Sequence, residues 1–262
     1  MRRTDKITKI RNQLAANKPS FGSWMQIPHP SVAEIMGDAG YDWVAVDLEH
    51  GSVGQHQLPD LFRALELGDC LPLARLAEGS AKNCKQALDA GAGGVIVPMV
   101  ESDVQLNAVR DACRWPPAGS RGVGFSRANL YGKRFRDYAE EAQAPLLVAM
   151  IENVRALDKL EHILEVEGLD AIMIGPYDLS SSMGLTGLFD HPKFIEATEL
   201  ILNLSKEKNL ACGVHVVTPD LEQLEQRVVE GYRFLAYSID ALFLRAGAES
   251  FYESNTIMGM RK

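Results

Sequence analysis

Short apolar runs recur along the chain and alternate with stretches in which apolar residues repeat every three or four positions. Runs of about four to eight apolar residues are typical of strands that are covered on both faces. Eight such runs are present, at residues 21–26, 43–49, 71–76, 94–100, 145–152, 171–175, 212–217 and 233–239. This pattern predicts a parallel sheet whose strands are separated by helices.

The stretches between the runs carry helix signals at their ends. One helix is expected from Ser80 to Gly91 and another from Thr218 to Gly231. Ser or Thr before the first turn and Gly after the last turn satisfy backbone groups that a helix leaves unpaired at its ends. Residues 191–209 carry a broad apolar stripe, which is typical of a helix packed on a sheet.

Eight strand–helix units in one chain of 262 residues predict a (β/α)8 barrel. The alternative is a doubly wound open sheet, which has the same alternation of strands and helices. No linker or low-complexity tract divides the chain, so residues 1–262 are expected to form a single barrel domain. Residues 114–144 remain outside the alternation, and segments of this length are often functional.

Composition excludes several classes of protein. The formal net charge of −8 argues against nonspecific binding of nucleic acid. No apolar stretch approaches the roughly 18 residues that a membrane helix requires, and the first residues lack the apolar core of a secretory signal. The four cysteines form no CxxC pair, which favours reduced thiols and a cytoplasmic protein.

Ionisable residues follow the carboxyl ends of several predicted strands. In a (β/α)8 barrel these strand ends meet at one face, where the active site lies. The residues are Asp47, Glu49 and His50 after the second run, Arg75 in the third, Glu152 at the end of the fifth, Asp178 after the sixth and His215 in the seventh.

Each of these residues also has an ordinary structural explanation. Glu152 could stabilise a helix N-terminus, Asp178 could cap a turn, Arg75 could form a structural ion pair, and His50 could be a loop residue. Because several independent strand ends place ionisable groups at the same face, their combination favours a functional site.

Two carboxylates without cysteine or paired histidine suit a hard divalent cation such as Mg²⁺ or Mn²⁺. The candidates for its ligands are Glu152 and Asp178, which come from neighbouring strands. A cation beside Arg75 would hold a 2-oxo acid, since a guanidinium pairs with oxygen in a fixed fork. His50 is a suitable proton carrier, because imidazole titrates near neutral pH.

The segments AGYDWVAVDLEH, GGVIVPMV, PPAGSRGVG and IENVRALDKLEHILEVEGLDAIMIGPYDLSSSMG resemble the HpcH/HpaI family of metal-dependent, pyruvate-utilising class II aldolases. The resemblance implies a (β/α)8 fold of the phosphoenolpyruvate/pyruvate superfamily. It also implies a carbon–carbon lyase that cleaves or forms a 4-hydroxy-2-oxo acid through a metal-bound pyruvate enolate. The expected cofactor is Mg²⁺, Mn²⁺ or Co²⁺. The expected substrates are pyruvate or oxaloacetate and an aldehyde, and the expected assembly is a hexamer built from dimers that exchange their C-terminal helix.

The resemblance also assigns residue roles. Glu152 and Asp178 would bind the metal, and Arg75 would bind pyruvate and stabilise the enolate. His50 would belong to the proton-transfer network, linked directly or through water to Asp47.

Two further positions follow from the same resemblance. The backbone from Gly175 through Pro176 to Asp178 would receive the pyruvate carboxylate. Asp89 matches an acid that lies near the site of a neighbouring subunit.

Three positions differ from the degradative members of the family. Met150 stands where Gln is common, Tyr177 where Ala is frequent, and His215 where an apolar residue often lies near the aldehyde. Tyr177 adds a hydroxyl, and His215 adds a donor, an acceptor or a cation, so a polar aldehyde is expected as the acceptor. The loop at 124–132 is also slightly shorter than its counterpart.

Other functions remain open at this point. A citrate-synthase-like or thioester-cleaving enzyme would need a coenzyme A site, and the sequence has no phosphate-binding Gly loop. A non-catalytic barrel that binds a 2-oxo acid is a third possibility. A Schiff-base aldolase is disfavoured because no predicted strand end carries an obvious buried lysine.

Overall fold

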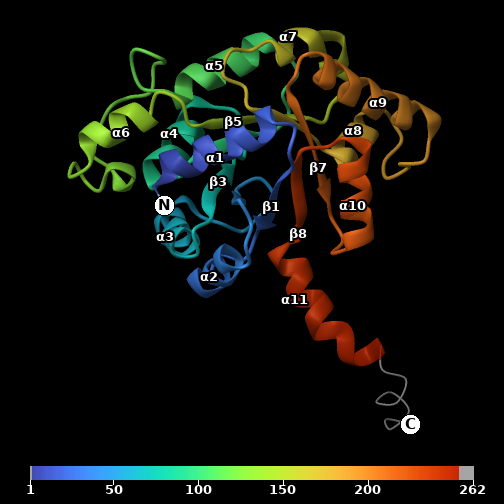
Figure 1. Cartoon of the computed structure of the whole chain (residues 1–262), viewed down its shortest axis with the longest axis horizontal. Helices are drawn as coiled ribbons and strands as arrows, with labels where there is room; N and C mark the ends of the chain where they lie inside the picture. The colour runs from blue at the N-terminus through green and yellow to red at the C-terminus, as the bar shows by residue number, and fades with distance from the viewer. Residues whose placement is uncertain (1, 254–262) are drawn as a thin grey trace.

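Eight parallel strands close into a barrel in the computed structural model, which describes residues 2–253 (Figure 1). The strands are β1 (Ser20–Met25), β2 (Trp43–Asp47), β3 (Leu71–Arg75), β4 (Gly94–Val97), β5 (Leu146–Ile151), β6 (Ala171–Ile174), β7 (Ala211–Val216) and β8 (Phe234–Ile239). Each strand pairs with the next in the sequence, and β8 pairs with β1. The prediction of a (β/α)8 barrel is therefore confirmed, and the open-sheet alternative is wrong.

Helices alternate with the strands along the chain, and most of them cover the outside of the barrel. They are α1 (Arg3–Ala15), α2 (Pro30–Asp38), α3 (Leu58–Leu67), α4 (Ala81–Ala90), α5 (Asp103–Cys113), α6 (Phe135–Glu141), α7 (Leu160–Leu164), α8 (Pro176–Ser182), α9 (Pro192–Glu207), α10 (Leu221–Glu230) and α11 (Asp240–Glu249). Short 3₁₀ helices lie at Gln55–Gln57, Arg127–Asn129, Val154–Lys159 and Ser250–Glu253. A larger hydrophobic core lies between these helices and the strands.

A second core fills the interior of the barrel. Its members point inward from the strands and include Trp24, Trp43, Leu73, Ile96, Val148, Met173 and Phe234. Ile7 and Ile10 of α1 belong to the same cluster and are 3% and 1% exposed. Helix α1 therefore packs on the barrel interior and closes its N-terminal end, which leaves the C-terminal end for a site.

Local sequence signals account for most element ends. The oxygen Oγ of Ser80 accepts a hydrogen bond from the amide of Asn83 at 3.3 Å, so Ser80 caps α4 as expected. The expected start of the helix at Thr218 is wrong, because Asp220 caps α10 by accepting from the amide of Gln223 at 3.1 Å. A carboxylate is at least as good an acceptor for this position as a hydroxyl.

Strand β4 is shorter than the apolar run 94–100 predicts. It ends at Val97 because the next residue is Pro98, which has no amide hydrogen to donate to a neighbouring strand. The backbone then turns at Met99, whose φ of 51° lies in the left-handed region. The apolar run continues to residue 100 in the sequence, but the strand ends at Val97.

The long segment 114–144 folds into an ordered unit on the outside of the barrel. It contains a 3₁₀ turn and α6, and Trp115, Ala128, Tyr138 and Ala142 form a small core of their own. Arg3 of α1 ties it to the barrel by donating to Glu141 at 2.7 Å and to the Ala128 carbonyl at 2.5 Å.

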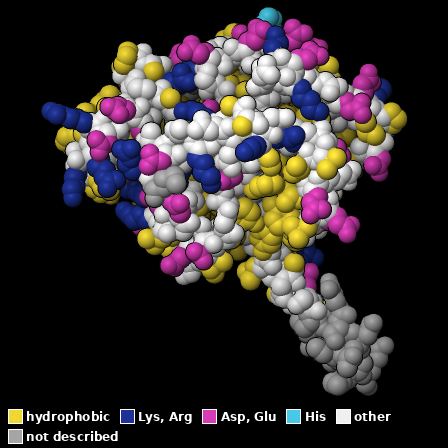
Figure 2. Space-filling view, in the orientation of Figure 1, with side chains coloured by type: hydrophobic (Ala, Val, Ile, Leu, Met, Phe, Trp, Pro, Cys, Tyr) yellow, Lys and Arg dark blue, Asp and Glu magenta, His cyan; other side chains and the backbone are white. Residues whose placement is uncertain are grey.

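Helix α11 leaves the barrel and projects away from it (Figure 1). Its Leu244 is 64% exposed. Figure 2 shows hydrophobic side chains gathered beside the point where the projecting segment departs. Within residues 2–253, no helix combines the length and the apolar character needed to cross a membrane.

Candidate active site

The predicted site residues converge at the C-terminal end of the barrel around a cavity of about 200 Å³. The cavity is lined by Trp24, Gln26, His50, Arg75, Met150, Glu152, Ile174, Gly175, Pro176, Tyr177, Asp178, His215, Val217 and Ile239. All of the predicted site residues except Asp47 and Asp89 are in this set. Asp47 is buried beside the cavity against Arg75, whereas Asp89 is half-buried on α4 and does not line it.

Arg75 and Asp47 form a two-pronged ion pair. The Nε and Nη2 atoms of Arg75 donate to the two carboxylate oxygens of Asp47 at 2.8 and 2.5 Å, and Gln26 donates to Asp47 at 2.8 Å. Burial opposes ionisation of Asp47, but the hydrogen bonds and charge of Arg75 outweigh it and lower the pKa of Asp47. The guanidinium also lies 4.6 Å from the ring centroid of Trp24, so its position is fixed on two sides.

Glu49 supplies a carboxylate that was noted in the sequence but given no role. Its Oε2 lies 3.3 Å from Nη1 of Arg75 and 3.9 Å from Nε2 of His50. This oxygen is buried and makes no well-aligned hydrogen bond, since the ion pair has the distance but not the angles of one. Burial raises the pKa of Glu49, although Arg75 and His50 oppose the shift.

His50 extends toward solvent at the edge of the cavity. Its side chain is 56% exposed and lies near Glu49. The sequence predicted a link between the imidazole of His50 and Asp47. In the structure the backbone amide of His50 donates to Asp47 Oδ1 at 3.2 Å. The imidazole lies near the carboxylate of Glu49, while both oxygens of Asp47 accept hydrogen bonds from Arg75.

Glu152 is the most deeply placed carboxylate of the cavity, at 2% exposed. Its Oε1 accepts from the amide of Met99 at 2.6 Å. Burial raises the pKa of Glu152 to about 7; the Met99 hydrogen bond opposes this shift, and the charges of Glu49 and Asp178 add to it. A buried carboxylate surrounded by other carboxylates favours a positively charged partner.

Gly175 leaves the room that Glu152 needs. A Cβ atom at position 175 would lie 2.4 Å from Glu152 Oε2 and 2.9 Å from its Cβ. Only glycine therefore fits opposite this carboxylate in its observed position.

Asp178 lies in the first turn of α8, after Pro176. Its side chain is exposed and lines the same cavity as Glu152, and its charge contributes to the raised pKa of Glu152. Two carboxylates fit a hard divalent cation, with substrate and water completing its coordination. No cluster of three or more His, Cys, Asp or Glu side chains suited to a metal occurs in the described part of the chain.

His215 is neutral near neutral pH. Burial lowers its pKa to about 4, so the expectation that it could act as a cation is wrong. Its Nε2 lies 3.2 Å from the carbonyl of Ser238. Because a carbonyl only accepts, Nε2 carries the hydrogen in this contact, and Nδ1 is left with a lone pair. Its ring also packs edge-on against Trp24, at 5.8 Å between centroids.

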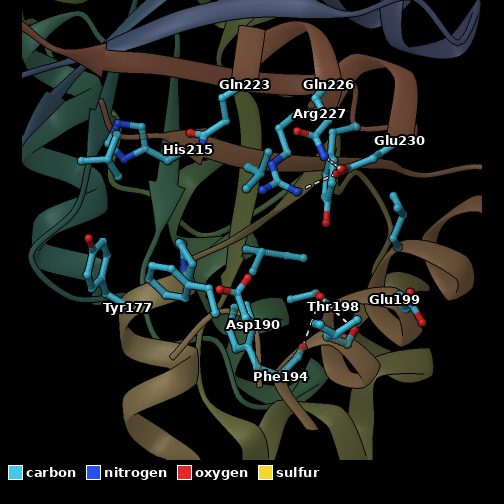
Figure 3. Close-up of a pocket in the computed structure, with 18 of the residues that line it drawn as sticks. Tyr177, Asp190, Phe194, Thr198, Glu199, His215, Gln223, Gln226, Arg227 and Glu230 are labelled. Carbon is cyan, nitrogen blue, oxygen red and sulfur yellow. Dashed lines mark hydrogen bonds and ion pairs between the residues drawn. The ribbon is translucent and has the colours of Figure 1, made fainter. Parts of the chain in front are cut away.

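Tyr177 lies at the same side of the cavity as His215 and is 54% exposed. Its ring packs edge-on against Phe189, with 5.0 Å between centroids. Both residues also border a larger groove of about 950 Å³ that runs outward between α9 and α10 (Figure 3). That groove contains neither Arg75 nor Glu152, so the smaller cavity is the candidate active site.

The long segment 114–144 contributes no side chain to the lining of this cavity. Its length is therefore not explained by the site of its own chain. Trp24, Gln26 and Met99 are site neighbours that sequence reasoning did not identify. For Trp24 and Gln26, their place at the end of the first predicted strand was an available signal.

An arginine beside two carboxylates at the mouth of a barrel can stabilise negative charge that develops on a bound ligand. The sequence comparison defines the family. Residues 20–246 match the model for HpcH/HpaI aldolase/citrate lyase, and the chain belongs to that family.

Similar proteins support this assignment. The chain is 35% identical to a hydroxypyruvate/pyruvate aldolase of Roseobacter denitrificans, with 92% of this chain and 94% of the relative covered. It is 33% identical to a 4-hydroxy-2-oxovalerate aldolase of Novosphingobium aromaticivorans, with 92% of each covered. A crystal structure of an HpcH/HpaI family protein from Burkholderia cenocepacia superposes with a TM-score of 0.87 at 30% identity, covering 94% of this chain and 98% of that one.

The predictions of the family and of an aldolase-type carbon–carbon lyase are confirmed. These sequence relatives, all above 30% identity, carry aldolase names. The citrate-synthase-like and non-catalytic alternatives are therefore less well supported than the aldolase.

Proposed function

We propose that this protein is a divalent-metal-dependent class II aldolase that cleaves or forms a 4-hydroxy-2-oxo acid by way of the enolate of pyruvate. The observation that carries the proposal is the meeting of Glu152, Asp178 and Arg75 at one small cavity. It also rests on the family to which the chain belongs.

The two carboxylates fit Mg²⁺, Mn²⁺ or Co²⁺. The donors are hard oxygens, and among the described residues the buried Glu152 carboxylate forms no direct ion pair. Glu152 and Asp178 would hold the cation, which supplies positive charge to the oxo acid and favours its enolate. The first turn of α8, from Pro176 to Asp178, would receive the carboxylate of the oxo acid.

Arg75 stabilises negative charge on the same substrate. Its guanidinium is held by Asp47 and Trp24, so it needs no reorganisation when charge develops on the oxygen of the oxo acid. Asp47 thus acts as the residue that orients Arg75, and its lowered pKa keeps it ionised.

His50 carries the proton. In the cleavage direction it accepts the proton of the 4-hydroxyl group while the bond between C3 and C4 breaks and its electrons form the enolate. Protonation of C3 then gives pyruvate. The partly exposed imidazole can exchange its proton with solvent, and Glu49 lies close enough to stabilise the imidazolium.

We propose a polar aldehyde as the second substrate. Support comes from His215, which offers the lone pair of Nδ1, and from the hydroxyl of Tyr177 at the same side of the cavity. The double variant His215→Leu/Tyr177→Ala should lose the preference in kcat/KM for a hydroxylated over an aliphatic aldehyde, while exchange of the pyruvate hydrogens persists. An unchanged preference would show that acceptor choice is set elsewhere.

We further propose a cytoplasmic enzyme formed by one barrel domain per chain and assembled as a hexamer built from dimers that exchange α11. Support comes from the projection of α11, from its exposed Leu244 and from four buried cysteines that are not in disulfides. Asp89 would then lie near a neighbouring subunit's site. Sedimentation velocity of the full chain tests the assembly.

The central test is the exchange of the pyruvate methyl hydrogens with deuterated water, followed by NMR. Exchange should stop after chelation and return with Mg²⁺, Mn²⁺ or Co²⁺. It should be absent in the double variant Glu152→Gln/Asp178→Asn under all of these conditions. Full exchange by the chelated double variant would contradict the proposal.

A further inference from the structure

The turn after β4 places a backbone amide against the most buried carboxylate of the site. The amide of Met99 donates to Oε1 of Glu152 at 2.6 Å. Met99 adopts a φ of 51°, which is unfavourable for a residue with a side chain. Such a conformation persists only where neighbouring groups hold it.

Gln105 of α5 holds this turn. Its Nε2 donates to the carbonyl of Met99 at 3.1 Å, and its Oε1 accepts from the amide of Glu101 at 2.9 Å. One side chain therefore binds the backbone on both sides of Val100. The amide of Val100 itself donates to the carbonyl of Met150 on β5 at 3.2 Å, which anchors the turn to the strand that carries Glu152.

The two oxygens of Glu152 have different surroundings. Oε1 is engaged by the Met99 amide, whereas Oε2 is the atom nearest to the space opposite Gly175. Gly175 immediately precedes α8, which carries Asp178. The Met99 hydrogen bond thus engages Oε1, while Oε2 lies on the side of Gly175, the residue before α8.

We propose that Gln105 is a positioning residue for the cation: by holding the Met99 peptide it fixes the orientation of Glu152 and presents Oε2 for ligation. This inference rests on the proposed metal site. Gln105 does not line the cavity, so it acts only through Met99. Groups that orient a metal ligand typically contribute a factor of about 10–100 in affinity.

The test measures Mn²⁺ affinity by calorimetry in the full-length, metal-free protein at pH 8.5. Gln105→Ala should bind Mn²⁺ about 10–100-fold more weakly than the unmodified protein. Gln105→Met keeps the length of the side chain without its hydrogen bonds, and it should show the same loss. Asn107→Ala is the matched control, because Asn107 lies on the same helix and donates only to the Asp103 carbonyl at 2.9 Å.

Thermal unfolding without metal separates positioning from a general structural role. A purely structural role of Gln105 would lower the unfolding temperature and leave Mn²⁺ affinity unchanged, and this result would overturn the inference. An equal loss of affinity in Asn107→Ala would overturn it as well. If Glu152→Gln/Asp178→Asn binds Mn²⁺ as the unmodified protein does, the metal site itself is wrong; if only the Gln105 variants match the unmodified protein, the site stands and the positioning role fails.

Discussion

The burial of Glu152 makes the free energy of unfolding of the metal-free protein depend on pH. Its pKa is raised from 4.5 to about 7, chiefly by burial. The folded protein therefore binds this proton more tightly than the unfolded chain does. The corresponding stability is fully present below about pH 4.5 and is lost as the pH rises through about 7.

The magnitude follows from the two values. At about 1.4 kcal/mol per pH unit, the interval from 4.5 to about 7 corresponds to about 3 kcal/mol. About 2 kcal/mol of this falls between pH 5.5 and pH 8.5, a range convenient for experiment. Glu152→Gln keeps the shape of the side chain and an oxygen for the Met99 amide, but it cannot ionise.

The free energy of unfolding in urea, measured with chelator at several pH values, tests this reasoning. Glu152→Gln should gain about 2 kcal/mol relative to the unmodified protein between pH 5.5 and pH 8.5. Asp178→Asn is the control, because that carboxylate is exposed and carries no comparable burial cost. Added Mg²⁺ should stabilise the unmodified protein at pH 8.5 and leave Glu152→Gln unaffected. Parallel stability curves for Glu152→Gln and the unmodified protein would refute the argument.

Three further substitutions test individual roles. Arg75→Lys keeps the charge but not the planar fork, so exchange of the pyruvate hydrogens should fall by about 10²–10³, and exchange at the normal rate would exclude the assigned role. His50→Ala should lower the rate of cleavage by about 10²–10⁴ with unchanged Mn²⁺ affinity; loss of metal binding in a folded variant would instead indicate a structural role. Gly175→Ala should weaken Mn²⁺ binding at least tenfold, because the new Cβ would lie 2.4 Å from Glu152 Oε2, and calorimetry checks this.

The fold was predictable because its signals are repeated. Each strand is a short apolar run covered on both faces, and eight consecutive runs leave few other arrangements. The predicted ends of strands and helices were wrong where a single residue determines the end of the element. Pro98 ends β4 inside an apolar run, and Asp220 replaces Thr218 as the cap of α10. Local patterns do not rank two acceptable capping residues two positions apart.

That most of the candidate site residues lie at one cavity was predictable for the same reason, since parallel strands bring their ends to one face. The hydrogen-bond and ion-pair partners of the individual residues were not predictable in this way. The imidazole of His50 lies beside the carboxylate of Glu49, whereas both oxygens of Asp47 accept hydrogen bonds from Arg75. The charge of His215 and the role of the Met99 amide depend on burial and backbone angles that no spacing in the sequence encodes.

Because α1 closes the N-terminal end of the barrel, the cavity is open only at the C-terminal end. Ile7 and Ile10 seal the N-terminal end from within, so ligands enter and leave only at the mouth. Glu152 is 2% exposed, whereas Tyr177 at the rim is 54% exposed. A ligand bound against Glu152 would lie deeper than one bound beside Tyr177. We therefore expect the deeper reactant to bind first and to leave last.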